Sequence, residues 1–193
     1  YMMKRIALLA FTGNHDGRRG QASTAECRLF LWVGTHFEKF QILDNSGGYD
    51  AETLTVDGDS TLLLVVVHEQ WTDVYAASLE SLEEFSGDVA DQGFSLLQQL
   101  DVAHGRDAKS FQLGEDRYLA LAVFRDSTSY EAESCVYLWD DDHRRFKEVQ
   151  RIRTSGAFDA DFLRFPDGAS HLLLANQRSS TSDLYSLTSE GWV

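Results

Sequence analysis

The chain has 193 residues, of which 43% are hydrophobic, and 31 acidic residues outnumber 17 basic ones to give a formal net charge of -14 at pH 7. Because proteins bind nucleic-acid phosphates through clustered Lys and Arg, this balance excludes nucleic acid as a partner. No apolar run approaches the roughly 18 residues of a membrane span, so the sequence predicts a folded globular chain without membrane insertion.

The chain opens with three short runs whose alternating or continuous apolar residues are typical of β-strands. They read "KRIALLAF", "CRLFLWV" and "FEKFQIL", and we interpret residues 1–43 as an incomplete repeat unit. The apolar stretch of the first run is short and no small-residue cleavage site follows it. It therefore predicts a strand rather than a signal peptide.

Three longer units follow at about 50–100, 107–152 and 159–193. The first two units contain four strand-like runs each, and the last contains three with a short remnant of a fourth. Turn-forming residues such as Asp57-Gly58-Asp59 separate the runs, which predicts hairpins within each unit. The second run of each unit is apolar on both faces, as expected of a strand that is covered on both sides.

The units share a spacing that chance does not explain. A Gln is followed nine places later by an Asp-Ala pair in three places, namely Gln41 with Asp50-Ala51, Gln98 with Asp107-Ala108, and Gln150 with Asp159-Ala160. The unit length is close to the roughly 40–50 residues of a four-stranded propeller blade plus insertions. The sequence therefore predicts an all-β fold, with residues 1–193 forming one partial β-propeller of about three and a half four-stranded antiparallel blades.

The third run of each unit carries aromatic residues, which are Phe30 and Trp32, Tyr75, Tyr137 and Trp139, and Tyr185. We expect these rings to fill the space between adjacent blades, because aromatic side chains bury a large area at modest entropic cost. Stacking against a carbohydrate is the alternative. Cys27 and Cys135 fall on opposite faces of equivalent strands, so no disulfide between them is expected.

Two insertions lengthen connections between the runs. Residues 79–93 are rich in Glu and Asp, and residues 127–133 extend a second connection. Both are predicted to be exposed loops and early sites of proteolysis.

Local catalytic motifs are absent from the sequence. The six His residues show neither H-x-x-x-H nor H-E-x-x-H spacing; they are His15, His36, His68, His104, His143 and His171. His68-Glu69 is interpreted as a dipeptide at a strand edge, and Asp140–His143 as a solvated turn. No G-x-S-x-G elbow, phosphate loop or dinucleotide fingerprint occurs. Catalysis would need residues that only the fold brings together.

One stretch resembles a known repeat. Residues 144–177 read "RRFKEVQRIRTSGAFDADFLRFPDGASHLLLANQ", and the order F-x-x-x-Q-x-I, G-A-x-D, D-G and LLLAN resembles the epilepsy-associated repeat, also called the EAR or EPTP repeat. The resemblance covers almost the whole chain, and the unit at about 50–100 departs most, with His68-Glu69 in place of Ala-Asn. It implies a seven-bladed propeller, of which this chain is half, an extracellular protein-binding role and no catalysis.

The first and last units are both incomplete, and their runs do not add up to one blade. We therefore expect the chain to be a portion of a longer propeller. Association of chains through open blade edges is the alternative, since unpaired strand edges invite pairing.

The recurrent Asp residues are the candidate metal ligands. Asp50, Asp107 and Asp159 each begin the innermost strand of a blade, so their carboxylates are expected to converge on the central channel. Converging carboxylates favour a hard cation such as Ca²⁺, and the resemblance implies a channel calcium ion as in the leucine-rich glioma-inactivated proteins. In the alternative interpretation, each Asp caps its own loop through backbone amides.

The resemblance implies a non-catalytic, extracellular or cell-surface module that binds another protein, as a receptor, a ligand or an adhesion protein does, and the absence of local catalytic motifs agrees with it. The alternative is a propeller-based hydrolase or lyase with a site at the channel mouth. That alternative requires several His, Asp or Glu side chains that converge there and titrate abnormally.

Overall fold

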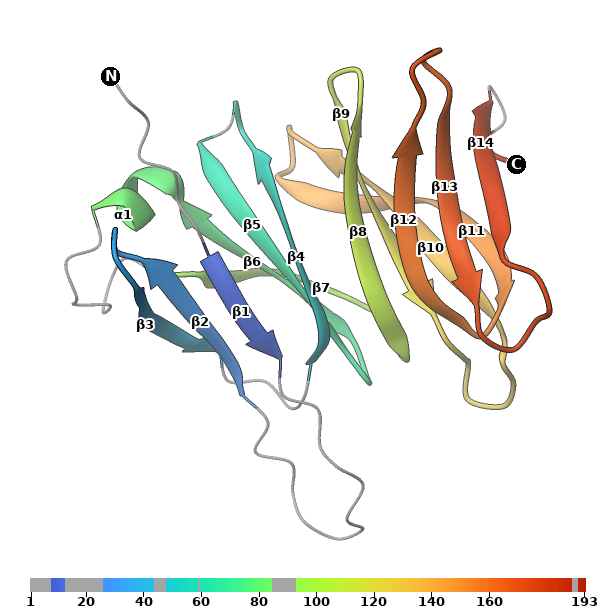
Figure 1. The fold of residues 1–193 in the computed structure, drawn as a ribbon, viewed down its shortest axis with the longest axis horizontal. Coiled ribbons are helices and arrows are strands. Elements are labelled where there is room, and N and C mark those ends of the chain that lie inside the picture. The colour runs from blue at the N-terminus through green and yellow to red at the C-terminus, as the bar shows by residue number, and fades with distance from the viewer. Residues whose placement is uncertain (1–7, 13–25, 44–47, 59, 85–92, 189–190) are drawn as a thin grey trace, which may run out of the picture.

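The computed structural model describes residues 8–12, 26–43, 48–58, 60–84, 93–188 and 191–193. These residues form four antiparallel sheets that follow one another in chain order (Figure 1). We call the sheets blades 1 to 4. The all-β fold of blade-like antiparallel sheets is thus confirmed, and the described part of the chain forms an open row of blades rather than a closed ring.

Each blade is a meander in which strands pair with their neighbours in sequence. Blade 1 contains β1 (Leu8–Thr12), β2 (Cys27–Trp32) and β3 (Phe37–Leu43). Blade 2 contains β4 (Gly48–Val56), β5 (Thr61–His68), β6 (Thr72–Ser78) and β7 (Ser95–Leu100). Blade 3 contains β8 (Gly105–Leu113), β9 (Asp116–Val123), β10 (Glu131–Asp140) and β11 (Arg145–Ser155). Blade 4 contains β12 (Ala157–Arg164), β13 (Ser170–Asn176), β14 (Asp183–Thr188) and β15 (Gly191–Trp192).

The first strands of blades 2, 3 and 4 lie side by side at the centre of the molecule (Figure 1). A register shift interrupts the pairing of each of these strands near its start, and the first residue after the shift is the recurrent Asp. Asp50 pairs with Val67, Asp107 with Ala122, and Asp159 with Ala175. The three Asp residues therefore occupy equivalent positions on successive innermost strands.

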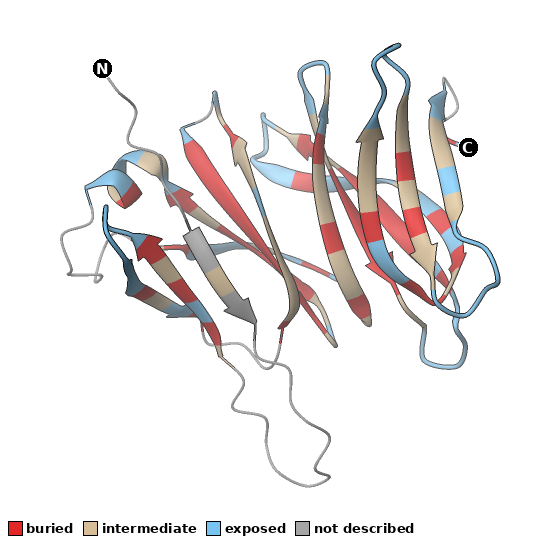
Figure 2. Cartoon of the chain, in the orientation of Figure 1, coloured by how far each residue is buried: buried red, intermediate tan, exposed pale blue. Residues whose placement is uncertain are grey.

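Apolar side chains fill the three gaps between adjacent blades. β5 is buried along its whole length (Figure 2), as predicted for a strand covered on both sides. Cys27 lies in the core between blades 1 and 2, whereas Cys135 lies in the core between blades 2 and 3. Both thiols are free, and burial raises the pKa of each to about 11.

The aromatic residues fill a gap between blades only where a neighbouring blade covers them. Trp139 and Phe146 form an edge-to-face pair at 5.2 Å and are 5% and 3% exposed between blades 2 and 3. The equivalent pair in blade 1, Trp32 and Phe37, has the same 5.2 Å separation but is 43% and 42% exposed. Within the described ranges, no blade covers that face of β2, so the prediction of burial is wrong for Trp32.

Both loop predictions need correction. Leu79–Glu83 form a short helix, α1, and Leu82 is 4% exposed because it packs into the core between blades 1 and 2. The Ser78 hydroxyl accepts the Ser81 N–H at 3.5 Å and caps this helix. Residues 85–92 lie outside the described residues. Residues 127–130 are exposed as predicted, but β10 already begins at Glu131 because it pairs with the long strand β11.

Candidate functional site

The repeated Gln side chains join the outermost strands of successive blades. Each Gln amide donates to the backbone oxygen and accepts from the backbone N–H of one residue in the next blade. The pairs are Gln41 with Phe94 (2.9 and 2.8 Å), Gln98 with Phe146 (3.0 and 2.8 Å), and Gln150 with Trp192 (2.7 and 2.7 Å). We call these three contacts the outer clamps. They explain why the Gln recurs at a fixed place in each unit.

The repeated Asp side chains make a second set of contacts, along the innermost strands. Asp50 Oδ2 accepts the backbone N–H of Ala108 at 3.0 Å, and Asp107 Oδ2 accepts that of Ala160 at 2.9 Å. We call these contacts the inner clamps. The capping interpretation foresaw a bond to a backbone amide, but it placed the amide in the loop of the Asp itself. The amide observed here belongs to the next blade, because the stacking of β4, β8 and β12 brings it closer.

The three Asp residues line one open cleft of about 280 Å³. Its lining residues are Asp50, Glu52, Asp107, Ala108, Lys109, Asp159, Ala160 and Asp161. Burial raises the pKa of Asp107, and the nearby carboxylates of Asp50 and Asp159 raise it further, to about 7, against the opposing effect of the Ala160 hydrogen bond. Burial also raises the pKa of Asp50. The structure thus brings the predicted carboxylates together in a strongly acidic cleft.

The side chains as they lie do not form a calcium cage. Ca²⁺ takes about 6–8 oxygen ligands, whereas Asp50 and Asp107 each commit an oxygen to a backbone N–H. In the part of the chain that the structure describes, no group of three or more His, Cys, Asp or Glu side chains is placed to hold a metal ion. Calcium binding at this cleft stays a prediction.

A second cluster lies where β4 and β8 begin, and Glu69 is its centre. Four side chains bind the Glu69 carboxylate, namely Tyr49 (2.6 Å), His104 (2.7 Å), Arg106 (3.0 Å) and Arg125 (3.2 Å). Partial burial opposes ionisation of Glu69, but these hydrogen bonds outweigh it and lower its pKa to about 2. We call this cluster the Glu69 hub. It ties blade 2 to blade 3. The interpretation of His68-Glu69 as an edge dipeptide did not predict this role of Glu69.

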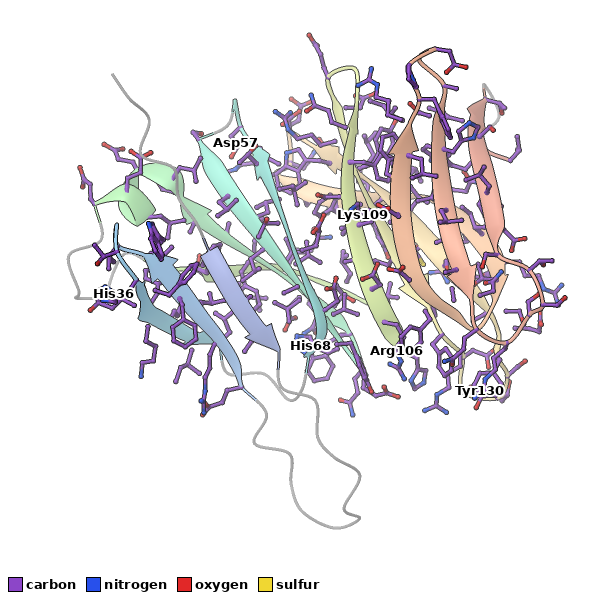
Figure 3. All side chains as sticks on the ribbon, in the orientation of Figure 1. His36, Asp57, His68, Arg106, Lys109 and Tyr130 are labelled. Carbon is purple, nitrogen blue, oxygen red and sulfur yellow. The ribbon has the colours of Figure 1, made fainter. Side chains whose placement is uncertain are left out.

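Arg and aromatic side chains continue from the hub toward blade 4. We call Arg106, Phe124, Tyr130, Phe158 and Arg178 the loop-end patch. Arg106 lies over the Tyr49 ring at 3.8 Å and the Phe124 ring at 5.1 Å, and Arg178 lies over the Tyr130 ring at 4.4 Å. Phe124 also makes edge-to-face contacts with Tyr130 and Phe158. Figure 3 shows Arg106 and Tyr130 at the same end of the molecule, opposite the end that carries Asp57.

Strand pairing corrects one detail of the repeat alignment. His68 pairs with Gly48 just as Asn176 pairs with Ala157, so His68, and not Glu69, occupies the place of the Asn in the Ala-Asn pair. His68 is 1% exposed, and its Nε2 lies 3.4 Å from Asp73 Oδ2. Asp141–His143 are exposed turn residues, as predicted, but Asp140 is the last residue of β10 and is only partly exposed, so the prediction is wrong for Asp140. His15 lies outside the described residues.

The comparisons with known proteins agree with the repeat. No protein-family model matches the chain. Over 90 residues, or 46% of its length, the chain is 33% identical to the thrombospondin-type laminin G domain and EAR repeat-containing proteins of Mus musculus and Homo sapiens. The match spans only 13% of each of these relatives. The predicted resemblance to EAR-repeat proteins is confirmed.

Proposed function

We propose that the chain is a non-catalytic, extracellular protein-binding module that meets a receptor, a ligand or an adhesion partner with its loop-end patch. The patch is the observation that carries the proposal. Arg, Tyr and Phe are enriched in protein–protein interfaces, and here they gather on one end of a chain whose net charge is -14. Tyr130 and Phe158 are 43% and 48% exposed, so their rings are accessible to a partner.

The clamps support this role because they hold the patch on a rigid frame. The patch takes residues from blades 3 and 4, and both an outer and an inner clamp join these two blades. Pre-organised side chains lose less conformational freedom on binding, which favours affinity. The names of the related proteins describe repeats and domains rather than an enzymatic activity, which also supports a binding module.

The lining of the acidic cleft counts against the hydrolase or lyase alternative. Its described titratable side chains are five carboxylates and Lys109, with no His to serve as a proton shuttle. Lys109 forms a salt bridge with Asp161 at 3.0 Å.

The described helices include none that is long and apolar enough to cross a membrane.

The proposal is tested by cross-linking the chain to proteins on intact cells and identifying the captured protein. We expect the double variant Tyr130→Ser, Phe158→Ser to lose capture of one specific protein. The matched control is Phe165→Ser, since Phe165 is 45% exposed but follows the opposite end of β12. Capture that survives the double variant, or that Phe165→Ser abolishes equally, contradicts this role of the patch.

Association of chains through open blade edges stays a prediction, and we propose in addition that the exposed face of blade 1 takes part in self-association of the isolated chain. The Trp32 and Phe37 rings, which are 43% and 42% exposed, would be covered by such an association. Sedimentation velocity is expected to show concentration-dependent association that Trp32→Ser weakens. A stable monomer at all concentrations refutes this proposal.

A further inference from the structure

The same backbone positions serve two different purposes at two neighbouring blade joints. Glu69 is the first residue after β5 in blade 2, and Phe124 is the first residue after β9 in blade 3. Arg125 is the second residue after β9 in blade 3, and Arg178 is the second residue after β13 in blade 4. Arg125 reaches back to the Glu69 carboxylate of blade 2 at 3.2 Å. Arg178 reaches back toward blade 3 in the same way, but it meets the Phe124 ring at 5.8 Å.

A second equivalent pair explains how Arg178 lies so close to the joint. His104 and Gly156 precede β8 and β12 with similar backbone angles, at φ 59° and 63°. His104 directs its ring to Glu69, whereas Gly156 has no side chain. A Cβ at Gly156 would lie 2.5 Å from Arg178 Cγ, so the glycine provides the space for the Arg178 stem.

Arg178 is thus held in place without an internal carboxylate. No ion pair joins it to a described residue, and the residue is exposed. The Tyr130 ring supports one face of the guanidinium at 4.4 Å and leaves its N–H groups available. A guanidinium in this state binds a carboxylate through two parallel hydrogen bonds, and stacking on a ring reduces the entropy lost in doing so.

We infer that the joint between blades 3 and 4 receives an Asp or Glu side chain of a partner protein, which takes the place that Glu69 occupies at the joint between blades 2 and 3. This inference rests on the proposed function and specifies its partner chemistry. Arg178 supplies the charge, whereas Arg106, which also lies over the Phe124 ring at 5.1 Å, is already bound to Glu69. Tyr130 and Phe158 supply apolar contact for a residue next to the acid. The partner segment is therefore acidic and also carries an aromatic or aliphatic side chain.

The probe for this site is a blocked hexapeptide of alternating Glu and Tyr, compared with the same peptide carrying Gln in place of Glu. Binding is followed by NMR through the Arg178 Nε–Hε signal and the backbone amides of residues 124–130. We expect the Glu peptide to shift these signals and to bind at least about tenfold more tightly than the Gln peptide, since charge-assisted hydrogen bonds are the stronger ones.

Three variants of the chain sharpen the test. Arg178→Gln is expected to weaken binding of the Glu peptide at least tenfold, whereas Arg164→Gln, an exposed Arg at the far end of β12, is expected to leave it unchanged. Phe124→Glu restores an internal carboxylate and is expected to compete with the peptide. Equal binding of the two peptides, or undiminished binding to Arg178→Gln, overturns the inference. Capture on cells that depends on Tyr130 and Phe158 but not on Arg178 overturns it too, while the proposed function stands.

Discussion

Blades 2, 3 and 4 are joined both by outer clamps and by inner clamps, and the two kinds of clamp differ in their chemistry. An outer clamp is a neutral amide that both donates to and accepts from one backbone unit, as Gln98 does with Phe146. An inner clamp uses one carboxyl oxygen to accept one backbone N–H, and its neighbours are further carboxyl groups. The outer clamps therefore stabilise the fold at any pH, whereas the inner clamps stabilise it at the cost of electrostatic repulsion. The comparison shows that a regular spacing in sequence does not imply equal energetics at both ends of a blade.

Removal of an outer clamp is expected to have the largest effect. Gln98→Leu leaves the N–H and the oxygen of Phe146 without their partner. Two unpaired buried groups cost about 2–6 kcal/mol together. Because both hydrogen bonds are only partly buried, the free energy of unfolding should fall by the lower part of that range, about 2–4 kcal/mol. Urea unfolding measures this change. Gln112→Leu is the control, because Gln112 is exposed and bonds only to Gly114 O in its own hairpin. Similar losses in both variants contradict the role assigned to the clamp.

Calcium is expected to raise the stability of the folded chain through the carboxylates of the inner clamps and not through the outer clamps. If the ion bridges Asp50, Asp107 and Asp159, calcium at about 100 times its dissociation constant stabilises the folded state by about 2.7 kcal/mol. The melting temperature should therefore rise with calcium in the wild type and in Gln98→Leu, but not in Asp107→Asn. Asp167→Asn serves as the control, since Asp167 caps a local turn through Ala169 N–H. Identical melting curves in calcium and in chelator refute the cation.

The smallest effect is expected from pH, measured in chelator. Asp107 has a folded-state pKa of about 7, above the ordinary value of about 3.9. Between these values the folded chain holds a proton that the unfolded chain has lost, so stability should fall as pH rises from about 4 to about 7. Asp107→Asn removes this slope while keeping an oxygen for the Ala160 N–H. At pH 8 it should gain about 1 kcal/mol, a modest value because solvent screens a partly exposed group.

Urea midpoints at pH 5 and pH 8 measure this slope. Asp167→Asn should follow the wild type, because its carboxylate lies on an exposed turn. A slope that Asp107→Asn leaves intact would show that Asp107 is not the group whose raised pKa produces it, and would contradict the prediction.

The strands were predictable because their signals are local. Alternation, apolar runs and turn residues lie within a few positions of one another, as in Thr61–His68, which is buried throughout. The clamps were visible only as a spacing. Gln41 and Phe94 lie 53 residues apart in sequence, and no local pattern says which backbone an amide will meet. Glu69 was missed for the same reason, since His104 and Arg125 reach it from positions 35 and 56 residues away.

The Gln side chain of an outer clamp forms hydrogen bonds only with main-chain atoms of the next blade, so the clamp does not depend on which side chain that residue carries. Phe94, Phe146 and Trp192 all occupy that place. A joint of this kind lets one unit be copied, exchanged or inserted beside another without the two having to change in concert. Selection is then free to alter the loops between strands while the joints persist, as the different residues around Glu69 and Phe124 illustrate. A lineage built from such units can acquire new binding surfaces by duplication before any single contact has been refined.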